Sequence, residues 1–140
     1  MCGFFFLYRN KVKCFYLHSA LAVNQERKRY SEIINGGIYV SILFEPVTIG
    51  ATGSMVVKNR FVRSATHDFM GNEDGSLSDR EFDLYRTLAA HEVGLIITGH
   101  AYVQHPTGRV RVCQNAIYDD CFIEGYRKLA GIVHEYGSKL

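Results

Sequence analysis

The stretch LFEPVTIGATGSMVVKNRFVRSAT, residues 43–66, decides the fold of this 140-residue chain. Its apolar residues predict two short β segments at Val47–Ile49 and Met55–Val57, which the turn-rich GATGS separates. RFVRSAT at residues 60–66 predicts a further strand, and turn formers fill the loop HDFMGNEDGSL that follows it. The expected arrangement is a hairpin followed by a strand and a long loop.

A helix is expected next, in SDREFDLYRTLA at residues 78–89. Ser78 and Glu81 form a capping box, in which the hydroxyl accepts from an amide of the first turn and the carboxylate reaches back. Apolar residues recur at helical spacing and predict one buried face: Phe82, Tyr85, Leu88 and Ala89. The continuous apolar run at residues 93–98 is typical of a parallel strand that is buried on both faces.

A second helix is expected after an irregular loop. Asp119 or Asp120 can cap it, and Gly137 suits the position just after its end. Residues 138–140 would then begin a third strand. The buried stripe of this helix is predicted at five positions: Phe122, Tyr126, Leu129, Val133 and Tyr136.

Strands that alternate with helices predict an α/β fold with right-handed parallel crossovers. Periodicity alone does not separate a (β/α)8 barrel from an open, doubly wound sheet. The loop GNEDG lacks the G-x-G-x-x-G pattern that carries a phosphate onto a helix N-terminus, so it gives no support to the open sheet.

Residues 40–140 resemble the opening of the Old Yellow Enzyme family, the FMN-dependent NADH:flavin oxidoreductases and ene-reductases. The resemblance is carried by LFEPVTIGATGSMVVKNRFVRSAT, by SDREFDLYRTLA and by VGLIITG. It implies the N-terminal portion of a (β/α)8 TIM barrel, namely a β-hairpin plus about two βα units of an FMN-binding domain. The segment SATHDF is more similar to the long-chain branch of the family than to the yeast enzymes.

Chemistry in a barrel sits at the C-terminal ends of the strands, which are SATH and TGH in this chain. The resemblance implies that Ser64, Ala65 and Thr66 contact the flavin edge. It also implies that His67 or Thr66 tunes the flavin potential, since a donor near N5 or O4 favours the reduced ring. The remaining cofactor-binding candidates come from the second strand: Gly99, which lets a flat ring lie close to backbone, and His100, where a small residue is expected.

Simpler interpretations stay open for these and neighbouring residues. Ser64 and Thr66 also suit plain strand-end hydroxyls, and His67 with His100 would be a metal pair without a third ligand. Arg109 and Arg111 either meet a phosphate or lie in a solvated loop. Three aromatic residues pack either against substrate or against protein: Phe69, Tyr102 and Tyr118.

The resemblance implies hydride transfer from NAD(P)H through flavin N5 to an activated alkene, so the expected partner is a small electrophilic acceptor. No catalytic residue and no metal ligand is expected within this chain. The substrate-holding pair, the proton donor and the iron–sulfur cluster of the long-chain branch would all lie downstream, and the fragment alone is expected to be inactive. The alternatives are a non-catalytic remnant and a small flavodoxin-like flavin- or nucleotide-binding domain.

Residues 1–39 fall outside the resemblance. They hold six Lys/Arg against two Glu, whereas residues 40–140 hold ten against twelve acidic residues. We hypothesise that residues 1–39 are translated upstream sequence and that the natural protein starts at Val40. The run GFFFLY is too short to span a membrane, basic residues scattered among aromatic ones make a weak nucleic-acid patch, and the four cysteines show no C-x-x-C. A cytoplasmic protein without nucleic-acid or membrane partners is therefore expected.

Overall fold

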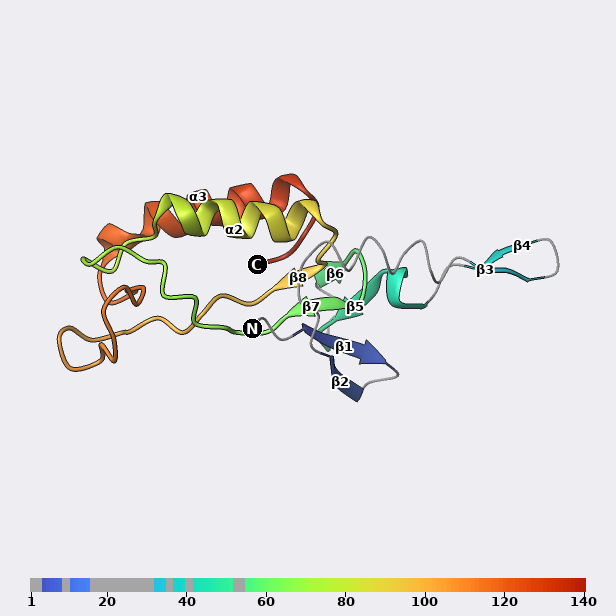
Figure 1. Cartoon of the computed structure of the whole chain (residues 1–140), viewed down its shortest axis with the longest axis horizontal. Helices are drawn as coiled ribbons and strands as arrows, with labels where there is room; N and C mark the ends of the chain where they lie inside the picture. The colour runs from blue at the N-terminus through green and yellow to red at the C-terminus, as the bar shows by residue number, and fades with distance from the viewer. Residues whose placement is uncertain (1–3, 9–10, 16–31, 35–36, 40–41, 52–54) are drawn as a thin grey trace.

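The computed structural model describes residues 4–8, 11–15, 32–34, 37–39, 42–51 and 55–140. The first part of the chain contributes short strands, and the two long helices follow later (Figure 1). The elements are β1 (Phe4–Tyr8), β2 (Lys11–Phe15), β3 (Glu32–Ile34), β4 (Gly37–Tyr39), η1 (Ile42–Phe44), β5 (Val47–Ile49), β6 (Met55–Val57), β7 (Phe61–Arg63), α2 (Asp79–Ala90), β8 (Leu95–Ile96), η2 (Asp120–Phe122) and α3 (Ile123–Glu135).

The main sheet has the strand order β2-β1-β7-β8. β7 and β8 are parallel, with Val62 opposite Leu95, as the crossover pattern predicts. Lys139 forms a further parallel bridge to Leu95, which confirms the start of a third strand near the end of the chain. On the other side, β1 runs antiparallel to β7, a neighbour that the sequence did not predict.

The predicted hairpin is confirmed as β5 and β6, which pair antiparallel with Val47 opposite Val57. β7 and β8 are shorter than the runs at residues 60–66 and 93–98. The ladder extends only where both neighbouring backbones stay in register, and beyond Ile97 the chain turns away into loops.

Helix α2 begins at the predicted capping box. Glu81 N donates to Ser78 Oγ over 3.3 Å, and Ser78 N donates to Glu81 Oε2 over 2.9 Å. The predicted apolar face is buried throughout, and it packs with the buried residues of β8 and α3 into the main core. Figure 1 shows α2 and α3 lying side by side along this core.

Helix α3 follows the short turn η2, whose N-cap Asp119 accepts from Cys121 N over 2.9 Å. Three residues of the predicted stripe are buried: Phe122, Leu129 and Val133. Tyr126 is half-buried and packs against the small cluster of Tyr102, Ala116 and Phe122. Tyr136 is 41% exposed because it is the C-cap residue after the last turn of α3, so its assignment to the stripe is wrong, whereas Ile132, which was not predicted, is buried. Gly137 has φ +69 and ends the helix as predicted.

The described residues form a partial α/β arrangement in which no barrel is closed. The proposed boundary at residue 40 stays a prediction, because residues 40 and 41 lie outside the described part. Within the described residues, no helix combines the length and the apolar composition that crossing a bilayer requires.

Candidate functional site at the strand ends

The chain segments that leave β7 and β8 meet at one edge of the sheet, because the two strands are parallel. Their backbones come very close at Gly99. A Cβ atom placed on Gly99 would lie 2.8 Å from the carbonyl oxygen of Thr66, well inside normal contact. The expectation that a small residue is needed here therefore has a geometric reason in this structure.

His67 and His100 meet directly across this edge. His67 Nδ1 lies 3.0 Å from His100 Nε2, and the two rings stand edge to face with centroids 4.5 Å apart. The sequence left the direction of His100 open, and the structure turns it toward His67. Burial lowers the pKa of His67 most strongly, and the nearby His100 lowers it further.

The two tuning candidates differ in their hydrogen bonds. Thr66 Oγ1 donates to the carbonyl oxygen of Ser64 over 3.1 Å, so its proton is already engaged. His67 Nε2 is enclosed and has no hydrogen-bond partner among the described residues. A buried polar atom without a partner is costly, which makes His67 Nε2 the better candidate for bonding an incoming acceptor.

Arg63 supports this edge from behind and was not predicted as a site residue. Its side chain is fully buried, and Nη1 donates to Tyr85 Oη over 3.5 Å and to the carbonyl oxygen of Ile97 over 3.4 Å. Nη2 lies 3.9 Å from Asp68 Oδ2. Arg63 thus links β7, the exit of β8 and the helix α2. The available sequence signal was a basic residue directly after the apolar pair Phe61 and Val62 in the predicted strand.

The loop residues that were left open fall into two groups. Tyr102 is 2% exposed and packs with Ala116 and Phe122, so it belongs to a small core. Tyr118 stacks on Tyr102 with ring centroids 5.5 Å apart but stays largely exposed. Phe69 is 52% exposed, and its ring stacks on His67 with centroids 4.0 Å apart.

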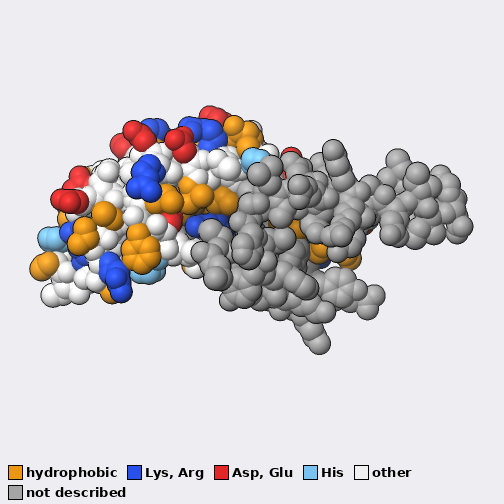
Figure 2. Space-filling model, in the orientation of Figure 1, with side chains coloured by type: hydrophobic (Ala, Val, Ile, Leu, Met, Phe, Trp, Pro, Cys, Tyr) orange, Lys and Arg blue, Asp and Glu red, His pale blue; other side chains and the backbone are white. Residues whose placement is uncertain are grey.

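Figure 2 shows hydrophobic side chains lying among Lys and Arg side chains at the loop end of the molecule, whereas charges of both signs cover the helices.

In the part of the chain that the structure describes, no three His, Cys, Asp or Glu residues lie close enough to hold a metal ion. His67 and His100 are therefore a hydrogen-bonded pair in this structure, without a third ligand.

A hairpin, two parallel strands each followed by a helix, and polar groups gathered at the strand ends are what the opening of a (β/α)8-barrel domain provides. More specifically, the chain belongs to the NADH:flavin oxidoreductase / NADH oxidase family, whose pattern matches residues 42–140.

Curated relatives agree with this assignment. The chain is 40% identical over 91 residues to an NADH oxidase of Thermoanaerobacter brockii, an alignment that covers 65% of this chain and 14% of that protein. It is 38% identical over 99 residues to an NADPH dehydrogenase of Bacillus subtilis (strain 168), covering 70% of this chain and 28% of the relative. The chain therefore spans less than a third of the length of these relatives.

Solved structures show the same fold. The Old Yellow Enzyme of Pichia sp. AKU4542 matches 69% of this chain and 24% of its own, with 29% identity and a TM-score of 0.62. A 2-naphthoyl-CoA reductase bound to 2-naphthoyl-CoA matches 69% of this chain and 14% of its own, with 28% identity and a TM-score of 0.64. These matches favour the barrel over an open, doubly wound sheet.

Proposed function

We propose that this chain forms the N-terminal part of the FMN site of an NAD(P)H-dependent oxidoreductase of the ene-reductase type. The observation that carries the proposal is His67 Nε2, a buried nitrogen for which the described residues offer no hydrogen-bond partner, at the edge where the family's flavin is expected. The close approach of Gly99 to Thr66 agrees with it, because this edge leaves no room for a side chain.

The residues present suit such a cofactor. Ser64, Ala65 and Thr66 would contact the ring edge through their backbone, as the family resemblance implies. Bound FMN supplies the redox centre that couples oxidation of NAD(P)H to reduction of an electron-poor alkene. A hydrogen bond from His67 would favour the reduced form, since reduction adds negative charge to the ring.

His100 has a defined part in this proposal. When His100 Nε2 donates to His67 Nδ1, the neutral His67 ring must carry its proton on Nε2. The lowered pKa of His67 keeps the ring neutral near pH 7, so Nε2 is then a donor rather than an acceptor. His100 would thus act as a positioning residue that fixes the tautomer of His67.

Because the chain corresponds to less than a third of the length of these relatives, the proposal is tested in a complete barrel. Residues 42–140 can replace the corresponding segment of the Bacillus subtilis NADPH dehydrogenase, to which they are 38% identical. In this chimera, His67→Phe keeps a flat ring but removes the donor. Loss of one charge-assisted hydrogen bond of about 1.5–3 kcal/mol should lower the flavin midpoint potential by roughly 30–60 mV.

The half-reactions give a second readout. Reduction of the flavin by NADPH should slow and its reoxidation by an enone should accelerate, because the reduced form has lost stabilisation. His105→Phe serves as the control, since His105 is exposed in the loop and does not contact His67. An unchanged potential with both half-reactions slowed equally would assign His67 a structural role instead.

We expect the 140-residue chain by itself neither to retain FMN nor to oxidise NAD(P)H. Two strand–helix units supply one side of the ring at most, whereas a barrel site draws on several strands. Flavin fluorescence and NADPH consumption in the presence of an activated enone measure both properties. Stoichiometric FMN retention by the isolated chain would show that the site needs no further strands.

A further inference from the structure

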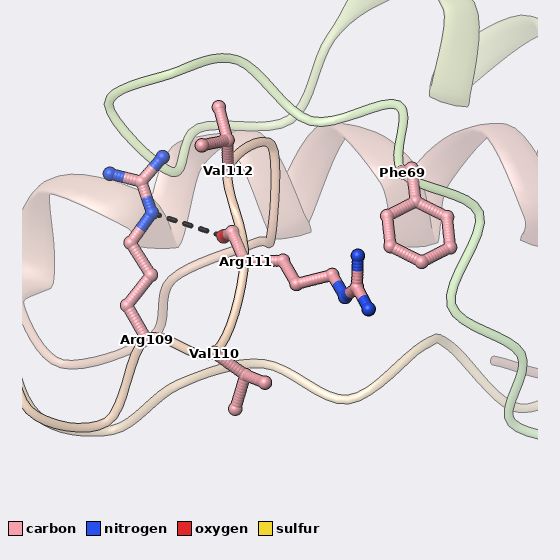
Figure 3. A pocket seen from close by; sticks show the side chains of 5 residues that line it. All are labelled: Phe69, Arg109, Val110, Arg111 and Val112. Carbon is pink, nitrogen blue, oxygen red and sulfur yellow. Dashed lines mark hydrogen bonds between the residues drawn. The ribbon is translucent and has the colours of Figure 1, made fainter.

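A second feature lies beside the strand-end site: an open recess of about 580 Å³. Phe69 lines it from the loop after β7, and four consecutive residues line it from the loop after β8: Arg109, Val110, Arg111 and Val112. Figure 3 shows the Arg111 side chain extending toward the Phe69 ring, while Arg109 lies on the other side of the same loop. The guanidinium carbon of Arg111 is 5.8 Å from the centroid of that ring.

The recess contains two guanidinium groups. In the described part of the chain, the four ion pairs join other residues, and neither Arg109 nor Arg111 has a carboxylate partner. Arg109 Nε donates to the carbonyl oxygen of Arg111 over 3.2 Å, which leaves the outer nitrogens available. Val110 and Val112 are 76% and 63% exposed, so apolar surface lies between the charges.

The walls of the recess are held in place. The buried Gln114 accepts from the backbone nitrogens of Val110 and Arg111 over 2.9 and 3.4 Å. Phe69 and Cys113 adopt φ values of 58 and 60, a region that residues other than glycine rarely occupy. Such strained positions persist where the surrounding structure fixes them. Gln114 thus holds the backbone of the arginine-bearing turn at Val110 and Arg111.

The recess shares one wall with the strand-end site. The Phe69 ring that forms one wall stacks on His67, with ring centroids 4.0 Å apart. Arg111 is also near enough to contribute to the lowered pKa of His67, although burial and His100 contribute more. The Phe69 ring therefore touches His67 and also lies near the Arg111 guanidinium, so the recess and the strand-end site adjoin at this ring.

We propose that this recess binds an anionic group, a carboxylate or a phosphate, of the small molecule that reacts at the neighbouring site. A guanidinium fork pairs with the two oxygens of either group, and the valines and Phe69 suit the hydrocarbon or ring that carries it. The identity of this molecule as hydride donor or acceptor rests on the proposed flavin chemistry, whereas the anion site itself does not.

The site is tested first by heteronuclear NMR titration of the complete 140-residue chain without flavin. The probes are benzoate, its neutral counterpart benzamide, and inorganic pyrophosphate. Benzoate or pyrophosphate should shift the backbone resonances of Phe69 and residues 109–112, and benzamide should shift them far less. Arg109→Gln with Arg111→Gln should weaken the binding by about tenfold or more, as expected for loss of charge-assisted hydrogen bonds.

The control is Arg80→Gln, which removes a charge from the exposed start of α2 and should leave the titration unchanged. Equal binding of benzamide and benzoate, or full binding by the double variant, would overturn the proposal. Tighter binding of pyrophosphate would indicate the phosphates of a dinucleotide, and tighter binding of benzoate would indicate a carboxylate-bearing acceptor. Because the titration contains no flavin, its result does not depend on whether the chain binds FMN.

A second measurement uses the chimera described above. The double glutamine variant should raise KM for 4-oxo-2-pentenoate, an anionic activated alkene, but not for its neutral methyl ester, with kcat preserved for both. An equal rise in KM for acid and ester would show that the arginines support the fold and do not bind the anion.

Discussion

Asn115 Nδ2 donates a hydrogen bond to Glu81 Oε1 over 2.6 Å and thereby joins the loop after β8 to the first turn of α2. The other carboxylate oxygen accepts from Ser78 N, so Glu81 serves the helix cap and the loop together. Glu81 is fully buried, and this burial raises its pKa, against the opposing effect of its hydrogen bonds. The loop that presents the arginines is thus fixed to the helix through one carboxylate.

The raised pKa of Glu81 has a consequence for stability. A folded-state pKa above the unfolded value means that the folded chain binds the proton more tightly, so the contribution of Glu81 is complete below pH 4.5 and is lost as pH rises through the folded-state pKa. Glu81→Gln removes this titration. The melting temperature of the variant, relative to that of the wild type, should therefore increase as the pH rises above 4.5. Parallel curves over this range would contradict the linkage.

Ser78→Ala tests the capping box itself. The variant leaves the amide of Glu81 without its side-chain acceptor, which should lower the free energy of unfolding by about 1 kcal/mol. Thr87→Ala is the matched control, because Thr87 is exposed on the same helix and its hydroxyl only bonds back to the carbonyl of Asp83. Urea denaturation should show little change for Thr87→Ala, and equal losses in both variants would contradict a specific cap.

Local features of this fold were predictable because their causes are local. The capping box at Ser78, the apolar face of α2 and the stop at Gly137 each depend on residues within a few positions of one another. Periodicity did not separate the barrel from an open sheet, since both place buried strands between helices, and the family resemblance made that choice correctly. The antiparallel pairing of β1 with β7 was not predictable either, because the residue pattern of a strand does not show which distant strand it will pair with.

The residues of the candidate site likewise fall into those that the sequence predicted and those that it did not. The strand-end positions of Thr66, His67 and Gly99 followed from the general rule for parallel strands and from the family resemblance. The contact of His67 with His100 and the support from Arg63 join residues about thirty positions apart or more on different elements. Such pairings depend on the register of β7 against β8, which one residue of slippage would change.

The His67–His100 pair gives a prediction about titration. His100→Ala removes the nearby imidazole that disfavours a charge on His67, so the pKa of His67 should rise toward its ordinary value of 6.5. It should not reach that value, because burial is the larger cause and remains. The imidazole proton resonances followed against pH measure this shift. His134→Ala on the exposed side of α3 should leave it unchanged, and a constant pKa in His100→Ala would assign the whole shift to burial.

Gly99→Ala and Gly131→Ala should change stability in opposite directions. At Gly99 the added methyl would lie 2.8 Å from the backbone oxygen of Thr66, and a backbone atom cannot rotate away as a side chain can. We expect a loss of about 1–3 kcal/mol and a displacement of His67 from His100, visible as a change in the His67 titration. At Gly131 nothing lies within 4 Å, so alanine should stabilise α3 by roughly 0.5–1 kcal/mol. Urea denaturation compares the two variants directly, and a gain at Gly99 would mean that the strand ends do not touch.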